Sequence, residues 1–455
     1  MSAVETGTSA ELPSLSRDRA FLGMTVTQFL GAFNDNLFKQ LVLLICVDHA
    51  ARSGRDFQDI ALALFAIPFV LLSGYAGFLA DRTSKRRIVV LCKVGEIAVM
   101  LLGMTAFFLG TGNPERQLFY LFVVLGLMST QSAFFGPSKY GILPELFRDR
   151  DLPMVNGVIQ MTTFTAIIFG MALAGYCKEW LGDQLWIVSG ICMGIAVAGT
   201  LTSLFIRKTS VAHPGLRFRV SSLAINADTW KMLRADRKLM GVLLISSLVW
   251  FLGGVSQPAV NAFGKIRLHY SDGRTSMLAA CLGVGIAVGC LFAGKASHKR
   301  VAFHLVTWGA WGLFLSFLAL IGVGLLGEEL PKQAVNAVPQ GMLELLTPRS
   351  ATDWAARGVL TSLGIFAGLF VVPLQVFMQS RPPEDQKGRM IGAMNLINWI
   401  GIVFSAAFYG VAVKVINTSG LPPADVYWIF AALAVVILPV AVFYRPRKET
   451  PSAEC

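Results

Sequence analysis

The sequence predicts an all-α membrane protein with twelve transmembrane helices, arranged as two pseudo-repeats of six. Hydrophobic residues make up 55% and charged residues only 15% of the 455 residues, and the mean hydropathy is +0.62. The apolar residues fall in runs of about 20, the length with which a helix crosses a bilayer. These runs are residues 20–47, 57–80, 88–110, 117–138, 154–177, 184–206, 239–263, 275–294, 301–325, 354–379, 389–415 and 424–444.

The longest polar connection separates the first six runs from the last six. It predicts an N-terminal six-helix bundle at 1–206, a cytoplasmic linker at 207–238 and a C-terminal six-helix bundle at 239–455. A weak internal repeat supports this division, because "GFLADRTSKRRIVV" after the second run resembles "CLFAGKASHKRVAF" after the eighth. Repeated halves of this kind place a central site at their interface.

The charge distribution predicts the orientation of the chain. The formal net charge is +12, and most of the 39 lysines and arginines lie in segments that share one side of the membrane. Because positive charge accumulates in cytoplasmic segments, we expect both termini in the cytoplasm. The same distribution indicates contact with a lipid bilayer and argues against nucleic acid as a partner. The polar N-terminus is not followed by a short apolar region with a cleavage site, so we expect no cleaved signal peptide.

Cysteine and histidine residues indicate neither a metal site nor a disulfide framework. The seven cysteines form no CxxC pair, and the five histidines are scattered along the chain. Six of the cysteines lie in or beside the apolar runs, where cysteine serves as a small apolar residue. We therefore expect no metal ion and no cofactor.

The first apolar run contains an unusual polar stretch, "FNDNLFK", at residues 33–39. Its polar residues Asn34, Asp35, Asn36 and Lys39 lie near the middle of the membrane, where a charge costs roughly 2.5–3.5 kcal/mol. Asp35 and Lys39 are four residues apart and can pair. Two interpretations remain open: a buried ion pair that locks the helix to a neighbour, or a polar substrate-binding site in a central cavity. The surplus of polar groups favours the site.

A second polar cluster lies at the end of the fourth run, where Pro137 loosens the helix. Here Lys139 and Tyr140 are candidates for the cytoplasmic half of the cavity or for a lateral opening. The alternative is a lysine that extends to the membrane interface.

The second half of the chain offers mainly amides as candidate substrate-binding residues, namely Gln257, Asn395 and Asn398. Hydrogen bonds between helices explain these amides equally well. Lys93 and Glu96, three residues apart, are predicted to form a structural pair.

The loop "GFLADRTSKRR" at 77–87 resembles the signature between the second and third helices of the major facilitator superfamily. Ser84 stands where that signature usually has glycine. The resemblance implies the major facilitator fold and a gating role for Asp81, Arg82 and Arg86, which would link the cytoplasmic helix ends and stabilise the outward-open state. The alternative is an ordinary basic cytoplasmic loop.

Three longer segments resemble the lysophospholipid transporter family, a branch of that superfamily. They are "GAFNDNLFK" (31–39), "FFGPSKYGILPEL" (134–146) and "GLFVVPLQVFMQSRPPEDQKGRMIGAMN" (368–395). The resemblance implies a flippase that moves lysophospholipids across the bacterial inner membrane by alternating access. It also implies that Asp35 and Lys139 lie in the polar part of the substrate path, and that a separate acyltransferase is a possible partner, since some members are fused to one.

Two other functions are alternatives to the flippase. The first is a proton-coupled major facilitator transporter of a small polar or drug-like solute, with Asp35 as its proton site. The second is the fused acyltransferase itself, which needs an H-x-x-x-x-D motif that none of the five histidines provides. We therefore expect that the protein is not an enzyme.

Overall fold

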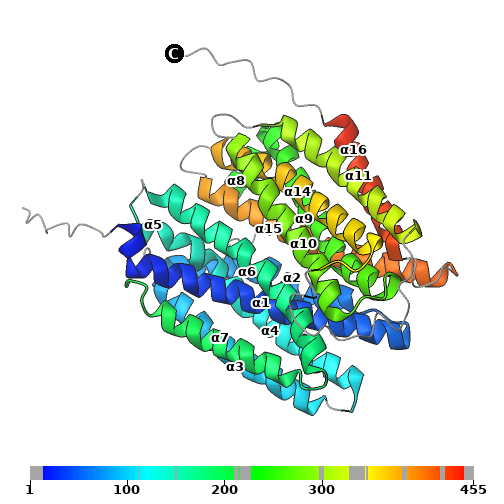
Figure 1. Cartoon of the computed structure of the whole chain (residues 1–455). Coiled ribbons are helices and arrows are strands. Elements are labelled where there is room, and N and C mark those ends of the chain that lie inside the picture. Colours follow the sequence, from blue (N-terminus) through cyan, green and yellow to red (C-terminus); the bar gives the residue numbers. More distant parts are fainter. Residues whose placement is uncertain are drawn as a thin grey trace, which may run out of the picture.

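In the computed structural model, all regular secondary structure in the described part of the chain is helical (Figure 1). The predicted linker lies largely outside the described part, as do residues 297–301 of the second repeat copy. The structure describes residues 14–110, 112–148, 151–209, 215, 227–296, 302–326, 344, 347–381, 387–420 and 426–444.

Each of the twelve predicted runs coincides with one helix. Eleven helices are long and apolar enough to cross a membrane, and α16 is a shorter apolar helix of 16 residues. The all-helical membrane fold is therefore confirmed. The elements are η1 (Leu15–Arg17), α1 (Arg19–Ser53), α2 (Gln58–Arg82), α3 (Lys85–Leu109), α4 (Pro114–Gly141), α5 (Leu143–Leu146), α6 (Leu152–Leu181), α7 (Trp186–Ser203), α8 (Ala227–Ala235), α9 (Arg237–Ala262), η4 (Phe263–Arg267), α10 (Asp272–Ala296), α11 (His304–Leu326), α14 (Ala351–Ser380), α15 (Lys387–Thr418) and α16 (Trp428–Phe443).

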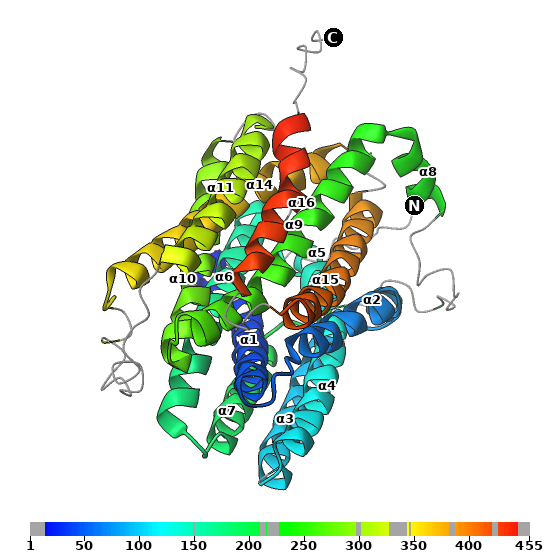
Figure 2. The same ribbon diagram turned by 90° about the vertical axis from the view of Figure 1, so that its right-hand side faces the viewer.

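Helices α1 to α7 gather in one group and α9 to α16 in another, here called the N-half and the C-half (Figure 1). The halves meet chiefly where α6 packs on α10 and α2 on α15, with smaller contacts of α1 and α2 with α9. Figure 2 shows α2 lying beside α15, although the two helices are more than 300 residues apart in sequence. A seam between the halves therefore runs through the centre of the molecule.

Helix α1 has well-defined ends that orient the bundle. Its N-cap Asp18 accepts a hydrogen bond from the backbone of Ala20 (2.8 Å), and its C-cap Gly54 adopts the left-handed conformation with φ of 72°. A left-handed residue after a helix is most often glycine, because a side chain there is strained. By the predicted topology, Asp18 lies at the inner end and Gly54 at the outer end of the molecule.

One part of the seam depends on a glycine. A Cβ atom on Gly175 of α6 would lie 2.3 Å from the carbonyl oxygen of Asp272 and 2.3 Å from Ser276 Oγ. Only glycine therefore allows the outer ends of α6 and α10 to approach this closely, as small residues do where membrane helices cross.

The predicted topology is testable at Thr418, an exposed residue at the end of α15. In a variant without its native cysteines, we expect Thr418→Cys to react with a membrane-impermeant maleimide in intact spheroplasts. A matched Lys238→Cys, exposed at the start of α9, should react only after permeabilisation. Labelling in the reverse order would show that the chain has the opposite orientation.

Candidate functional site

Four charged residues join the two halves at the outer end of the seam. They are Asp48 of α1 and Lys178 of α6 in the N-half, and Lys265 of η4 and Asp272 of α10 in the C-half. Lys178 pairs with Asp48 and with Asp272 (2.6 Å). Lys265 pairs with the same two acids, at 2.7 Å and 2.8 Å. Each base therefore contacts an acid of both halves, and this outer ionic cluster holds their outer ends together.

A layer of amides crosses the seam deeper in the molecule. Gln40 donates to Asn261 Oδ1 (2.9 Å), and Asn261 donates to Gln58 Oε1 (3.2 Å). Gln257 donates to Gln40 Oε1 (3.3 Å). Gln40 and Gln58 belong to the N-half and the other two to the C-half. This amide layer therefore joins the two halves through direct hydrogen bonds between their side chains.

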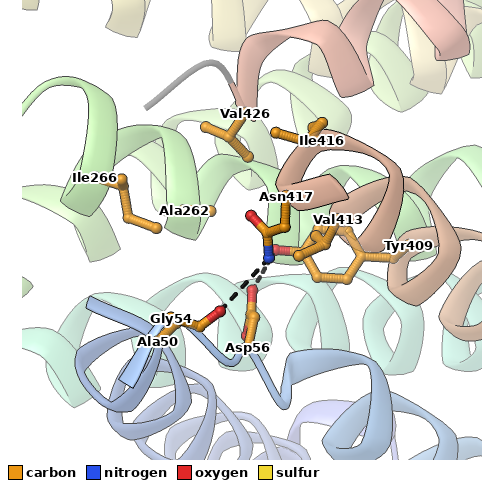
Figure 3. A pocket seen from close by; sticks show the side chains of 10 residues that line it. All are labelled: Ala50, Gly54, Asp56, Ala262, Ile266, Tyr409, Val413, Ile416, Asn417 and Val426. Carbon is orange, nitrogen blue, oxygen red and sulfur yellow. Dashed lines mark hydrogen bonds between the residues drawn. The ribbon is translucent and has the colours of Figure 1, made fainter. Parts of the chain in front are cut away.

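A small pocket lies beside the amide layer (Figure 3). Tyr409 donates to Asp56 (2.7 Å), and Asn417 donates to the carbonyl oxygen of Gly54 (3.5 Å), so α15 is fastened to the loop after α1. The pocket volume is about 40 Å³, and one water needs roughly 10–15 Å³. The pocket has room for a few waters but not for a lipid headgroup.

Asp35 and Lys39 lie on the inner side of the amide layer. Asp35 accepts a hydrogen bond from Ser132 of α4 (2.7 Å), whereas the ammonium of Lys39 lies over the ring of Phe65 of α2, 4.7 Å from its centroid. In the described part of the chain no ion pair joins Asp35 to Lys39. An ion pair between Asp35 and Lys39 that would lock α1 to a neighbouring helix is therefore not formed in this structure.

Lys139 points into the N-half. Its ammonium donates to Thr163 of α6 (3.0 Å), and Thr163 donates to Gln28 of α1 (2.8 Å). The side chain is only 7% exposed, while the neighbouring Tyr140 is 45% exposed with its ring 5.0 Å from the ammonium. A lysine that extends to the interface would expose its ammonium, which is not what the structure shows.

Asn34 and Asn36 lie apart from Asp35. Asn34 is fully buried and donates to Glu96 Oε1 of α3 (2.6 Å). The predicted pair of Lys93 and Glu96 is confirmed, with side chains 2% and 0% exposed. Asn36 donates to the carbonyl oxygen of Ala32 in its own helix (2.8 Å).

In the C-half, the predicted amides separate. Asn398 is buried and accepts a hydrogen bond from Ser246 of α9 (3.3 Å), whereas Asn395, one turn away, is exposed. Trp399, which no sequence pattern singled out, stacks on Phe69 of α2 with ring centroids 3.9 Å apart. Where α15 packs against α2, the C-half therefore presents the ring of Trp399 to the seam.

The loop after α2 is bonded within the N-half. Asp81 and Arg82 are exposed, and Arg82 lies over the ring of Phe78. Arg86 donates to the carbonyl oxygen of Leu204 (3.1 Å). Arg82 and Arg86 therefore contact residues of their own half. In the described part of the chain, the polar contacts across the seam lie in its middle and at the end that carries Asp48 and Asp272.

The inner end of the C-half is likewise bonded within itself. Asp236, the N-cap of α9, accepts a hydrogen bond from Arg381 at the end of α14 (2.9 Å). Desolvation raises the pKa of Asp236, but hydrogen bonds from Arg381 and from the Leu239 backbone outweigh it and hold that pKa below its usual value. Among the described residues, the ion pairs between the halves thus lie at the end that carries the outer ionic cluster, while Asp236 and Arg381 pair within the C-half at the other end.

Comparison with known proteins agrees with this architecture. The chain is 27% identical over 435 residues to the lysophospholipid transporter LplT of Enterobacter sp. (strain 638), covering 94% of this chain and 97% of that protein. It is 28% identical over 403 residues to LplT of Cronobacter sakazakii, covering 87% and 89%.

The fold is shared with solved structures. A bacterial homologue of the human lysosomal transporter Spinster, in an inward-facing and unoccupied conformation, superposes with a TM-score of 0.67 at 14% identity, covering 96% of this chain and 97% of that one. The family model of the Major Facilitator Superfamily matches residues 24–406. The chain therefore belongs to the Major Facilitator Superfamily, a family of transporters and not of enzymes.

Proposed function

We propose that this transporter moves lysophospholipids across the bacterial inner membrane by alternating access, with both termini in the cytoplasm. The relatives with this name cover nearly the whole chain. Substrate would enter from the outer leaflet in an outward-open state and leave on the inner side in the state described here. There it would become available to a separate acyltransferase, since a lysophospholipid has a free hydroxyl to acylate.

The chemical asymmetry of the seam carries this proposal. The N-half supplies the charged groups Asp35, Lys39 and Lys139, whereas the C-half supplies amides and the ring of Trp399. A lysophospholipid has a charged headgroup and a single acyl chain, so it suits a path that is charged on one side and uncharged on the other. The ammonium groups of Lys139 and Lys39 suit the phosphate, which forms strong charge-assisted hydrogen bonds.

The remaining predicted residues take different roles in this proposal. Gln257 belongs to the amide layer that closes the path on the outer side, and Tyr140 and Asn395 are exposed where substrate can reach them. Asn34 and Asn398 are bonded inside their own halves, so we assign them to helix packing.

In alternating access, contacts between the two halves form at the outer end of the seam in one state and at the inner end in the other. The outer ionic cluster and the amide layer are engaged here. Asp81 is exposed, as expected of an acid that pairs only when the inner ends meet. We propose that Asp81, with Arg82 and Arg86, forms the inner gate of the outward-open state.

The substrate proposal is tested with labelled lysophosphatidylethanolamine in proteoliposomes. We expect Lys139→Ala and Asp35→Ala each to slow its movement about ten-fold or more, because a hydrogen bond to a charged group contributes roughly 1.5–3 kcal/mol. Lys238→Ala, an exposed lysine at the inner end, is the control. Movement no faster than in empty liposomes, across several headgroups, would favour a proton-coupled transporter of a small solute instead.

The inner gate is tested by Asp81→Asn. We expect slower transport with unchanged membrane insertion and substrate binding, because the neutral amide weakens only the outward-open state. Asp183→Asn, an exposed acid at the opposite end, should transport normally. If Asp81→Asn transports at the rate of the unmodified protein, the loop is an ordinary basic cytoplasmic segment.

The outer ionic cluster is tested by Lys178→Met. This change leaves Asp48 and Asp272 facing Lys265 alone, and the lost contacts, at about 1.5–3 kcal/mol each, should shift the population toward outer opening at least ten-fold. Spin labels at Glu115 and Thr418, on the outer ends of the two halves, would report longer distances. Lys414→Met, an exposed lysine of α15, is the control, and distances equal in both variants would exclude a gating role.

A further inference from the structure

The short helix α8 has two unlike sides. Leu233 is fully buried in the apolar core of the C-half, and Met232 packs against that core. The other side carries the exposed residues Trp230, Lys231 and Arg234, here called the α8 face. Arg234 follows Trp230 by four residues and Lys231 by three, so the three side chains share one side of the helix. The buried Leu233 therefore fixes the direction in which the α8 face points.

The place of α8 in the chain sets its depth. Only Asp236 separates α8 from α9, which begins a membrane-spanning segment at Arg237. A helix so close to the start of a span lies at the boundary between hydrocarbon and water. Figure 2 shows α8 at the periphery of the C-half, beside the start of α9. The α8 face is therefore exposed at the level of the lipid headgroups.

The residue types of the α8 face fit this boundary. Lysine and arginine are costly in hydrocarbon, whereas a tryptophan is favourable where its ring meets lipid and its N–H group meets water. Trp230 is 38% exposed, and the guanidinium of Arg234 lies over its ring, 5.2 Å from the centroid. The ring and the charge are thus held together as a cation–π pair. Basic and aromatic helix faces of this kind bind membranes that carry anionic lipids.

The charges of the α8 face are not neutralised by the acid that follows it. Asp236 accepts hydrogen bonds from Arg381 (2.9 Å) and from two backbone N–H groups at the start of α9. In the part of the chain that the structure describes, no ion pair includes Lys231 or Arg234. Two adjacent positive charges therefore remain for an anion from outside the protein.

We propose that the α8 face binds an anionic phospholipid of the leaflet at the inner end of the molecule. Lys231 and Arg234 hold its phosphate through charge-assisted hydrogen bonds, and the Trp230 ring lies against the upper part of its acyl chains. This lipid is resident and not transported, because the α8 face lies at the periphery of the C-half. The site is independent of the proposed function, and only its assignment to the cytoplasmic leaflet rests on the proposed orientation.

Native mass spectrometry of the full-length protein with added phosphatidylglycerol tests the binding. Lys231→Gln/Arg234→Gln should weaken the binding of the first phosphatidylglycerol roughly ten-fold, because each base near an anionic lipid adds to the attraction. The matched control is Arg87→Gln/Lys208→Gln, which removes two exposed bases from the inner end of the N-half and should bind like the unmodified protein. Equal affinities in the two double variants would overturn the proposal.

Fluorescence distinguishes a lipid from a cytoplasmic protein as the occupant of the α8 face. In nanodiscs that contain phosphatidylglycerol, the part of the signal that Trp230→Phe removes belongs to Trp230. We expect this part to be quenched by lipids with brominated acyl chains and little by acrylamide in the aqueous phase. Quenching by acrylamide alone would show that the α8 face is open to water, where an acidic protein segment would be its partner, and would refute the lipid site.

Discussion

Most polar side chains along the membrane-spanning part of α1 bond to partners inside the protein, because hydrocarbon offers no hydrogen bonds. This constraint organises the structure around one helix. The partners come from four other helices and from the segment after α7. They are Arg207 for Asp18, Thr162 and Thr163 for Gln28, Glu96 for Asn34, Ser132 for Asp35, Asn261 for Gln40, and Lys178 for Asp48. Helix α1 consequently lies in the centre, bonded to its own half along its inner part and to the other half along its outer part.

The sequence predicted the helices well but their contacts poorly. Runs of apolar residues are a local signal, so all twelve predicted runs correspond to helices, and the pair of Lys93 and Glu96 followed from a spacing of three. The face shared by Asp35 and Lys39 also follows from spacing, yet each side chain turns to a different helix. Tertiary packing decides which helices lie beside α1. The spacing of residues in a single sequence does not identify these neighbours.

The outer ionic cluster was missed for the same reason. Its four residues come from four elements and span more than 200 positions, and each alone resembles an ordinary charge at the end of a membrane helix. The available signal was the pairing of acids and bases at helix ends that share the outer side. Trp399 gave no signal beyond its aromatic character, because its partner Phe69 lies more than 300 residues away.

The ion pair inside the N-half and the outer ionic cluster differ in burial. Lys93 and Glu96 are 2% and 0% exposed, and a pair so deeply buried is costly to separate because each charge would be left without water or partner. The side chains of the outer ionic cluster retain between 8% and 29% of their exposure, so water can replace a lost partner when the halves part. Each of these charge-assisted contacts contributes about 1.5–3 kcal/mol. Because the four pairs share the same four side chains, the loss of one base removes two contacts of the cluster at once. The seam therefore combines a permanent interior in the N-half with a rim whose contacts can be exchanged, which is the requirement for a path that opens alternately to each side.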